Sequence, residues 1–277
     1  MVSGYNRPPV THGYFAEGAD SLKDLIHYEF PLNERIRLLV RLEQLFAQLD
    51  HFRQGATVWD VRSAVFVLIQ LVELSNRSDL RSEVMQELDR QITSLNRMSG
   101  LQNGVDHRML GQAIEHLEAL NRNLFAEPGK PGLSLMEDDL FKSLMQRSNL
   151  PGGATSFDLP GYHFWLEGSP ERRALQINQW IRSFQPVRDA VDAVMNFIRT
   201  SALPTREESI SGFYQKTLDH TLPYQMVRIS LPRTALCYAE ISGGRHRFTV
   251  RFMLKDDGGR PVQVPDEVSF HLTCCLF

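Results

Sequence analysis

The hydrophobic pattern over the first two thirds of the chain has the period of an α-helix. From Asn33 onward, apolar residues recur at intervals of three and four, with charged residues between them: Leu38, Leu42, Leu45, Leu49 and Phe52. This predicts one amphipathic helix of about five turns. Two heptads are too few for a free coiled coil, so we expect the stripe to pack inside its own domain or a dimer.

Further helical segments follow. Residues 58–74 are apolar nearly all round, which predicts a central helix buried on most sides, and residues 79–98 are again amphipathic until two glycines end the pattern. A fourth helix is predicted from about Asp106, and a short one over 137–146. Ser169 before Pro170 is typical of a helix start, and Pro186 begins the last predicted helix. Four helices with short breaks favour a bundle-like layer.

The period changes to two from about Ile210. The segments YQMVRISL, RFTVRFML and EVSFHLTCCL read as strands, and the Gly-Gly pairs at 243–244 and 258–259 favour hairpin turns. Helices first and strands afterwards predict an α+β protein, with an N-terminal helical bundle-like domain followed by a C-terminal antiparallel β domain. We place a flexible leader at 1–24, the helical domain at 25–204 and the β domain at 205–277, which we expect to receive contacts from a corner at 149–168.

Composition narrows the class of protein. The chain has 277 residues, enough for one large or two modest domains, and its 30 basic and 33 acidic residues give no global positive field for nonspecific nucleic-acid binding. The three cysteines, Cys237, Cys274 and Cys275, predict reduced thiols in a cytosol. Residues 1–24 lack the apolar run of a signal peptide, and the longest apolar run, 64–69, is too short to span a membrane.

The most informative charge pattern is RHRFTVRF, residues 245–252. In a strand, Arg245, Arg247 and Arg251 fall on one face, while His246 and the intervening aromatic and aliphatic residues fall on the other. Such a face suits an extended partner that carries carboxylates, because guanidinium groups bind carboxylates in bidentate geometry. The alternative is a solvated strand face whose arginines pair with acids from elsewhere in the fold. The sequence pattern alone leaves both open.

The stretch NLPGGATSFDLPGYHFWL, residues 149–166, lies between helical patterns. Pro151 and the glycines after it end one helix, and Pro160-Gly161 is predicted to turn the chain toward the next. We expect the apolar side chains of this corner to anchor it in the core: Phe157, Leu159, Phe164 and Trp165.

Enzyme and metal sites are disfavoured by spacing. The glycines at 152–153 fit neither GxGxxG nor a phosphate loop ending in GK[ST]. Asp158 and His163 with Cys237 or Ser156 could be imagined as a triad, but nothing in their spacing imposes that geometry. His271 with Cys274 and Cys275 lacks a second pair at the spacing of a structural zinc site, so we predict no metal and no cofactor.

Six blocks of the sequence resemble the ZapD family of bacterial cell-division factors, which associate with FtsZ. They occur in family order from about residue 26 to the end: YEFPLNERIRLLVRLEQLF (28–46), RSDLRSEVMQELDRQ (77–91), LPGGATSFDLPGYHFWL (150–166), SGFYQ (211–215), EISGGRHRFTVRFM (240–253) and FHLTCC (270–275).

The resemblance implies a non-enzymatic cytoplasmic protein at the division site, acting as a homodimer that holds the C-terminal peptide of FtsZ and bundles its filaments. Basic residues of the family contact surface match Arg77, His163, Arg247 and Arg251 here. We add Arg245 from the basic strand and Arg228 from the strand predicted before it. The other hypothesis is a nucleic-acid-binding module that uses strand 245–251, although its Phe248 and Phe252 point away from the arginines.

The chain departs from the family pattern in two places. Relatives tend to carry basic residues at the start of the helix before the corner, where this chain has Glu137, Asp138 and Asp139. The segment 1–24 has no counterpart in the pattern.

Overall fold

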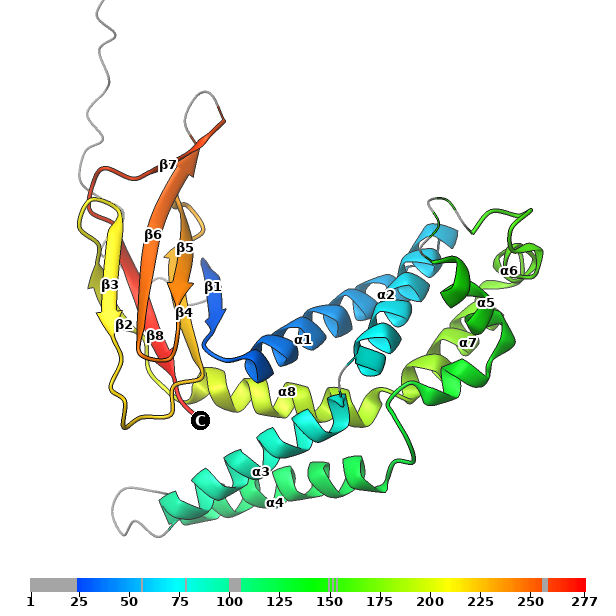
Figure 1. The fold of residues 1–277 in the computed structure, drawn as a ribbon, viewed down its shortest axis with the longest axis horizontal. Helices are drawn as coiled ribbons and strands as arrows, with labels where there is room; N and C mark the ends of the chain where they lie inside the picture. The colour runs from blue at the N-terminus through cyan, green and yellow to red at the C-terminus, as the bar shows by residue number, and fades with distance from the viewer. Residues whose placement is uncertain are drawn as a thin grey trace, which may run out of the picture. The chain divides into compact units, whose positions relative to one another are not determined.

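The computed structural model describes residues 24–55, 57–77, 79–99, 106–148, 150, 152, 154–255 and 259–277. The predicted leader therefore lies outside the described residues, apart from Asp24, as do Pro151 and Gly153 of the predicted corner. The chain divides into two compact units: a helical unit, 34–199, and a β unit formed by the segment before residue 34 together with 200–276 (Figure 1).

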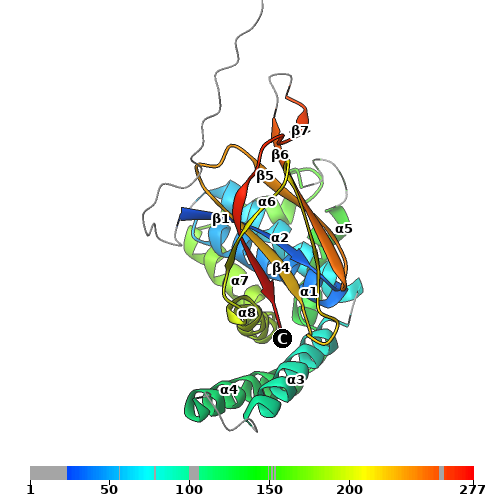
Figure 2. The same ribbon diagram turned by 90° about the vertical axis from the view of Figure 1, so that its left-hand side faces the viewer.

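The helical unit confirms the helical periodicity. Its elements are α1 (Glu34–Arg53), α2 (Val58–Arg77), α3 (Leu80–Ser99), α4 (His107–Ala126), a 3₁₀ turn η2 (Leu133–Glu137), α5 (Asp139–Arg147), α6 (Pro160–Leu166), α7 (Pro170–Arg182) and α8 (Gln185–Thr200). The predicted cap is in place, because the side chain of Ser169 accepts from Arg172 N before α7. The side chain of Asp106, near which a helix start was predicted, accepts from two backbone amides at the start of α4. In Figures 1 and 2, α3 and α4 lie side by side.

Ion pairs connect helices that are far apart in the sequence. The guanidinium of Arg188 on α8 binds the carboxylate of Asp50 on α1, with one Nη1–Oδ1 distance of 2.9 Å. The Arg188 hydrogen bond is the main reason that the pKa of Asp50 lies below its usual range. Asp192, one turn along α8, also contacts Arg188, but burial raises its pKa above the usual range. Asp50 is therefore the carboxylate whose charge stabilises this junction.

Asp50→Asn is expected to lower the free energy of unfolding by about 1 to 3 kcal/mol at neutral pH, because the carboxylate charge is lost and one of its two acceptor oxygens becomes an NH2 group that cannot accept from Arg188. The native pKa is lowered, so this stabilisation is present above the pKa of the unfolded state, about 3.9, and is lost as pH falls through the lowered native value. Urea unfolding of both proteins across this pH range checks it. Asp192→Asn is the matched control and should cost much less; equal costs would contradict the assignment.

The corner differs from its predicted packing. Pro160 starts α6 instead of forming a turn with Gly161, and the helix turns Tyr162 and Leu166, four residues apart, into the core. Phe157 and Phe164, predicted as core anchors, are each 82% exposed. The prediction was wrong for these two rings: Phe164 lies on the outward side of α6, opposite to Tyr162 and Leu166, and Phe157 lies in the turn that precedes the helix. Trp165 does pack, against Tyr162 and Trp180.

The β unit is a sandwich of two antiparallel sheets. One sheet has the order β1 (Leu25–Pro31), β4 (Met226–Pro232), β8 (Ser269–Cys275), β2 (Thr205–Glu208); the other has β3 (Phe213–Thr217), β6 (Arg247–Lys255), β5 (Tyr238–Gly243), with β7 (Pro261–Gln263) pairing β6. Residues 25–31 fell inside the predicted helical domain, but they pair with β4 along their whole length. The predicted α+β class is confirmed. The compact helical unit spans 34–199, whereas the predicted helical domain spanned 25–204.

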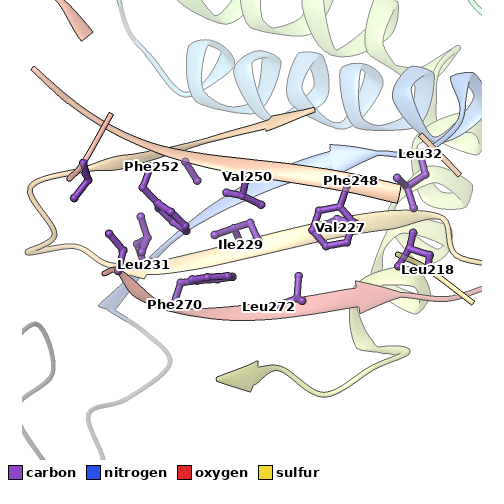
Figure 3. Close-up of a cluster of buried hydrophobic side chains, with 13 residues drawn as sticks. Leu32, Leu218, Val227, Ile229, Leu231, Phe248, Val250, Phe252, Phe270 and Leu272 are labelled. Atoms are coloured by element: carbon purple, nitrogen blue, oxygen red, sulfur yellow. The ribbon is translucent and has the colours of Figure 1, made fainter. Parts of the chain in front are cut away.

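The core of the β unit lies between the two sheets (Figure 3). Phe248, Val250 and Phe252 of β6 point toward β4 and β8 and are fully buried. Opposite them lie Val227, Ile229, Leu231, Phe270 and Leu272. This is the arrangement that strict alternation predicts for a strand with one buried face. The other face of β6 is consequently directed outward.

Candidate functional site: the arginine face

The outward face of β6 carries Arg247 and Arg251, both exposed, with the half-buried Thr249 between them. The alternation that buries Phe248 and Phe252 leaves these three side chains on the outer surface of the sheet. We call this surface, made by the outward residues of β3, β6 and β5, the arginine face. The two guanidinium-bearing positions are four residues apart, about 13 Å along the strand.

Arg245 does not belong to the strand. The β5–β6 hairpin turns over residues 244–246, and β6 starts at Arg247, so Arg245 lies exposed in the turn beyond the end of the face. His246 was predicted on the core side of the strand, which is wrong: it is exposed in the turn. Its Nδ1 lies 2.6 Å from Nδ1 of His220, and its carbonyl accepts from Leu218 N at 2.8 Å. These contacts fix the turn against the end of β3.

The positive charge of the face is only partly compensated. Glu240 of β5 lies directly opposite Arg251 in the strand register, and its carboxylate is 4.0 Å from the guanidinium, with both side chains about half exposed. No carboxylate of the described residues forms an ion pair with Arg247. An exposed pair at 4.0 Å is weak, so a partner carboxylate can compete for Arg251.

Arg228 lies on the other sheet. Its guanidinium donates twice to one carboxylate oxygen of Glu29 on β1, at 2.9 and 2.6 Å, and both side chains are largely buried. The strand register explains this contact, because Glu29 and Arg228 are direct partners of β1 and β4. Arg228 therefore holds β1 to the sheet and lies on a different sheet from the arginine face; its part in binding stays a prediction.

Arg77 and His163 belong to the helical unit. Arg77 ends α2, its side chain is 79% exposed, and its guanidinium lies 3.8 Å from the carboxylate of Glu73. His163 lies exposed on α6, where its backbone continues the helical hydrogen bonds. Both side chains are accessible, as a partner contact requires, and their part in binding stays a prediction.

The acids at 137–139 have a local structural role. Asp138 caps α5 by accepting from Phe141 N, and its second oxygen accepts from Gln176 and from the Trp180 indole, each at 3.1 Å. Asp139 is nearly fully exposed at the first turn of α5 and contacts Lys142. Of these three acids it is Asp138 whose carboxylate is used within the fold, whereas Glu137 and Asp139 are both exposed to solvent.

The triad that the sequence allowed does not form around Asp158. Its carboxylate accepts from the Thr155 hydroxyl at 2.6 Å and contacts Arg147 at 3.7 Å. Burial raises the pKa of the Cys237 and Cys274 thiols, which disfavours the nucleophilic thiolate. A cavity of about 230 Å³ between α2, α5 and the corner is lined by neither Asp158 nor His163. Within the described ranges, no three His, Cys, Asp or Glu side chains are grouped as metal ligands.

The sequence reading missed the neighbours of Arg251 on the adjacent strands. Phe213 of β3 is its direct partner on one side and Glu240 of β5 on the other. Phe213 is 41% exposed, and Ile210, bridged to it, is 77% exposed. The dipeptide Ser211-Gly212 before Phe213 is a turn signal that could have located this feature, but the pairing of β3 with β6 is not readable from local pattern.

Fold and surface together define a two-unit α+β protein whose candidate chemistry is the binding of an anionic partner on an open sheet face. No helix in the part of the chain that the structure describes is long and apolar enough to cross a membrane. A family model described as ZapD, cell division protein, matches residues 40–251. The chain belongs to the ZapD family, which supports a role in cell division.

The relatives match over nearly their whole lengths. Cell division protein ZapD of Methylococcus capsulatus is 45% identical over 255 residues, which cover 92% of this chain and 100% of that protein. Cell division protein ZapD of Azoarcus sp. is 34% identical over 252 residues, covering 91% and 99%. That of Aromatoleum aromaticum is 35% identical over 252 residues, covering 91% and 97%. The resemblance seen in the six sequence blocks is thereby confirmed.

Proposed function

We propose that this protein is a non-enzymatic adaptor that binds the C-terminal tail of FtsZ and, as a homodimer, cross-links FtsZ filaments in the cytoplasm at the division site. Two tail-binding surfaces in one dimer would join two filaments, and the linkage would strengthen both attachments through a high effective concentration. The family membership supports the cell-division role, and the FtsZ partner follows from the family resemblance.

The observation that carries the proposal is the arginine face. Arg247 and Arg251 are exposed on the outer surface of a well-packed sheet, so their positions are fixed by the core beneath them. An extended, carboxylate-bearing tail can lie across such a face and bind each guanidinium in turn. Exposed charge pairs are screened within about 8 Å at physiological ionic strength, so binding should weaken with added salt.

The alternative, a nucleic-acid-binding module, loses support from the packing. Phe248 and Phe252, the rings of the basic strand, are fully buried between the sheets and cannot stack on bases. Among the described residues of this face, Phe213 is the exposed ring, Tyr238 of β5 is only partly exposed, and the bridged neighbour Ile210 is aliphatic. We therefore keep nucleic-acid binding only as an outcome that a gel shift at physiological salt would reveal.

Co-sedimentation with polymerised FtsZ tests the partner and the docking motif together. The protein is expected to pellet with full-length FtsZ filaments and to stay in the supernatant with filaments of tail-deleted FtsZ. Light scattering on the same samples reports bundling. Equal pelleting with both kinds of filament would show that the tail is not the docking motif, and no pelleting with either would overturn the proposal.

A further inference from the structure

A two-residue turn at the start of β3 has a fixed geometry. Ile210 and Phe213 exchange both backbone hydrogen bonds, each 2.9 Å long, and the two residues between them have positive φ, 49° at Ser211 and 68° at Gly212. Positive φ at both central positions is characteristic of the type I′ hairpin turn. A Cβ at position 212 would lie 2.3 Å from the Val264 carbonyl oxygen, so only glycine fits.

The turn is held against the strand that carries the arginines. The carbonyl of Gly212 accepts from Phe252 N at 2.8 Å, and the amide of Gly212 donates to Asp266 O at 2.9 Å. Phe252 directly follows Arg251 in β6. The position of the turn relative to Arg251 is therefore set by the sheet itself.

The turn places two apolar side chains next to Arg251. Direct partners in an antiparallel ladder project from the same side of the sheet, about 4.5 to 5.5 Å apart. Ile210, Phe213, Arg251 and Glu240 consequently form one row across the arginine face. Tyr214, the next residue of β3, points the other way and packs on Phe270 in the core.

We propose that this row recognises a bulky apolar side chain next to a carboxylate in an extended acidic peptide, with the apolar group over Ile210 and Phe213 and the carboxylate on Arg251. The inference rests on the proposed function and specifies which part of the tail binds here. Ile210 and Phe213 are 77% and 41% exposed, so covering them removes apolar surface from water.

Charge sets the order of the two groups along the row. The carboxylate of Glu240 lies on the far side of Arg251 and repels a second carboxylate placed there. The partner's apolar side chain therefore lies on the β3 side of Arg251. An aliphatic residue beside a single ring favours burial of a side chain over stacking of nucleobases, so a peptide fits the row better than a nucleic acid.

Fluorescence anisotropy with a labelled synthetic FtsZ tail peptide tests the inference. Phe213→Ser is expected to weaken binding about 10-fold without changing its salt dependence, since no charge is altered, and Phe213→Leu should restore most of the affinity. Leu203→Ser is the control, because Leu203 is 88% exposed and precedes β2 of the other sheet. Backbone hydrogen exchange of β6 verifies that each variant is folded.

A second set of peptides identifies the group that is recognised. Each apolar residue of the tail is replaced by serine in turn, with all carboxylates kept. One replacement should weaken binding to the wild type about 10-fold and have little further effect on the Phe213→Ser variant, because the two changes remove the same contact. If the wild type binds the tail and the Phe213→Ser variant binds it with the same affinity, this inference is overturned while the proposed function stands. A wild type that binds no tail would overturn the proposed function and the inference with it.

Discussion

Replacing Arg247 and Arg251 together by glutamate is expected to weaken binding of the FtsZ tail by about 100-fold or more and to abolish filament bundling. Each exposed charge pair at about 4 Å contributes roughly 1 kcal/mol in water, and each reversal replaces an attraction by a repulsion. The two reversals sum to about 4 kcal/mol before salt screening, and about 2.7 kcal/mol already corresponds to 100-fold. Anisotropy titration of the labelled tail peptide at two salt concentrations measures the loss.

The control is a second double variant that changes the net charge of the protein by the same amount, but on α7. Arg172 and Arg182 on α7 are exposed and lie outside every predicted contact, so the Arg172→Glu/Arg182→Glu protein should bind the tail almost as the wild type does. Both double variants should keep the wild-type circular dichroism spectrum, because none of the four side chains is buried. Undiminished tail binding by the Arg247/Arg251 variant would exclude the arginine face as the docking surface.

A substitution of Glu240 is expected to raise the affinity for the tail at the same surface. Its carboxylate competes with a partner for Arg251 at 4.0 Å. Glu240→Gln is therefore expected to strengthen tail binding a few-fold, since an exposed pair is worth about 0.2 to 1 kcal/mol. A loss of affinity in this variant would show instead that Glu240 orients Arg251 for binding.

Local periodicity predicted what depends on a single segment. Helical stripes predicted α1, α2, α3, α4 and α8, while the start signal at Ser169-Pro170 predicted α7. The alternation in residues 247–252 correctly separated outward arginines from buried rings, because a strand with one buried face has a period of two. The start of that strand was misplaced by two residues, since the Gly-Gly turn extends through Arg245 and His246. Patterns give the faces of an element more securely than its ends.

Pairing between distant segments could not be predicted in this way. Arg228 was assigned to the contact surface, but its partner Glu29 is 199 residues away, on a strand that the sequence reading placed in the helical domain. Phe213 lies beside Arg251 because of the register between β3 and β6, which no local pattern encodes. The charged residues of the site were visible in the sequence, while the side chains that surround them were determined by long-range pairing.

The core beneath the arginine face should limit the stability of the β unit. The ring of Phe252 is fully buried and lies 4.9 Å from that of Phe270 on the opposite sheet (Figure 3). Phe252→Ala is expected to lower the free energy of unfolding by about 3 to 5 kcal/mol through lost burial and the cavity left behind. This is about a fifth or more of the roughly 5 to 15 kcal/mol that holds a typical domain folded.

Two variants and two readouts make this prediction specific. Phe252→Leu keeps most of the volume and should cost about 1 to 2 kcal/mol, and Phe157→Ala, at a ring that is 82% exposed, should change stability by no more than about 0.5 kcal/mol. Hydrogen exchange of β6 and β8 amides reports on the stability of the β unit, while tryptophan fluorescence follows unfolding of the helical unit, where Trp59, Trp165 and Trp180 all lie.

Phe252→Ala should also weaken tail binding although both arginines remain, because the strand that positions them is less often folded. Exchange protection in β6 equal to that of the Phe157→Ala protein would refute the central role of this ring.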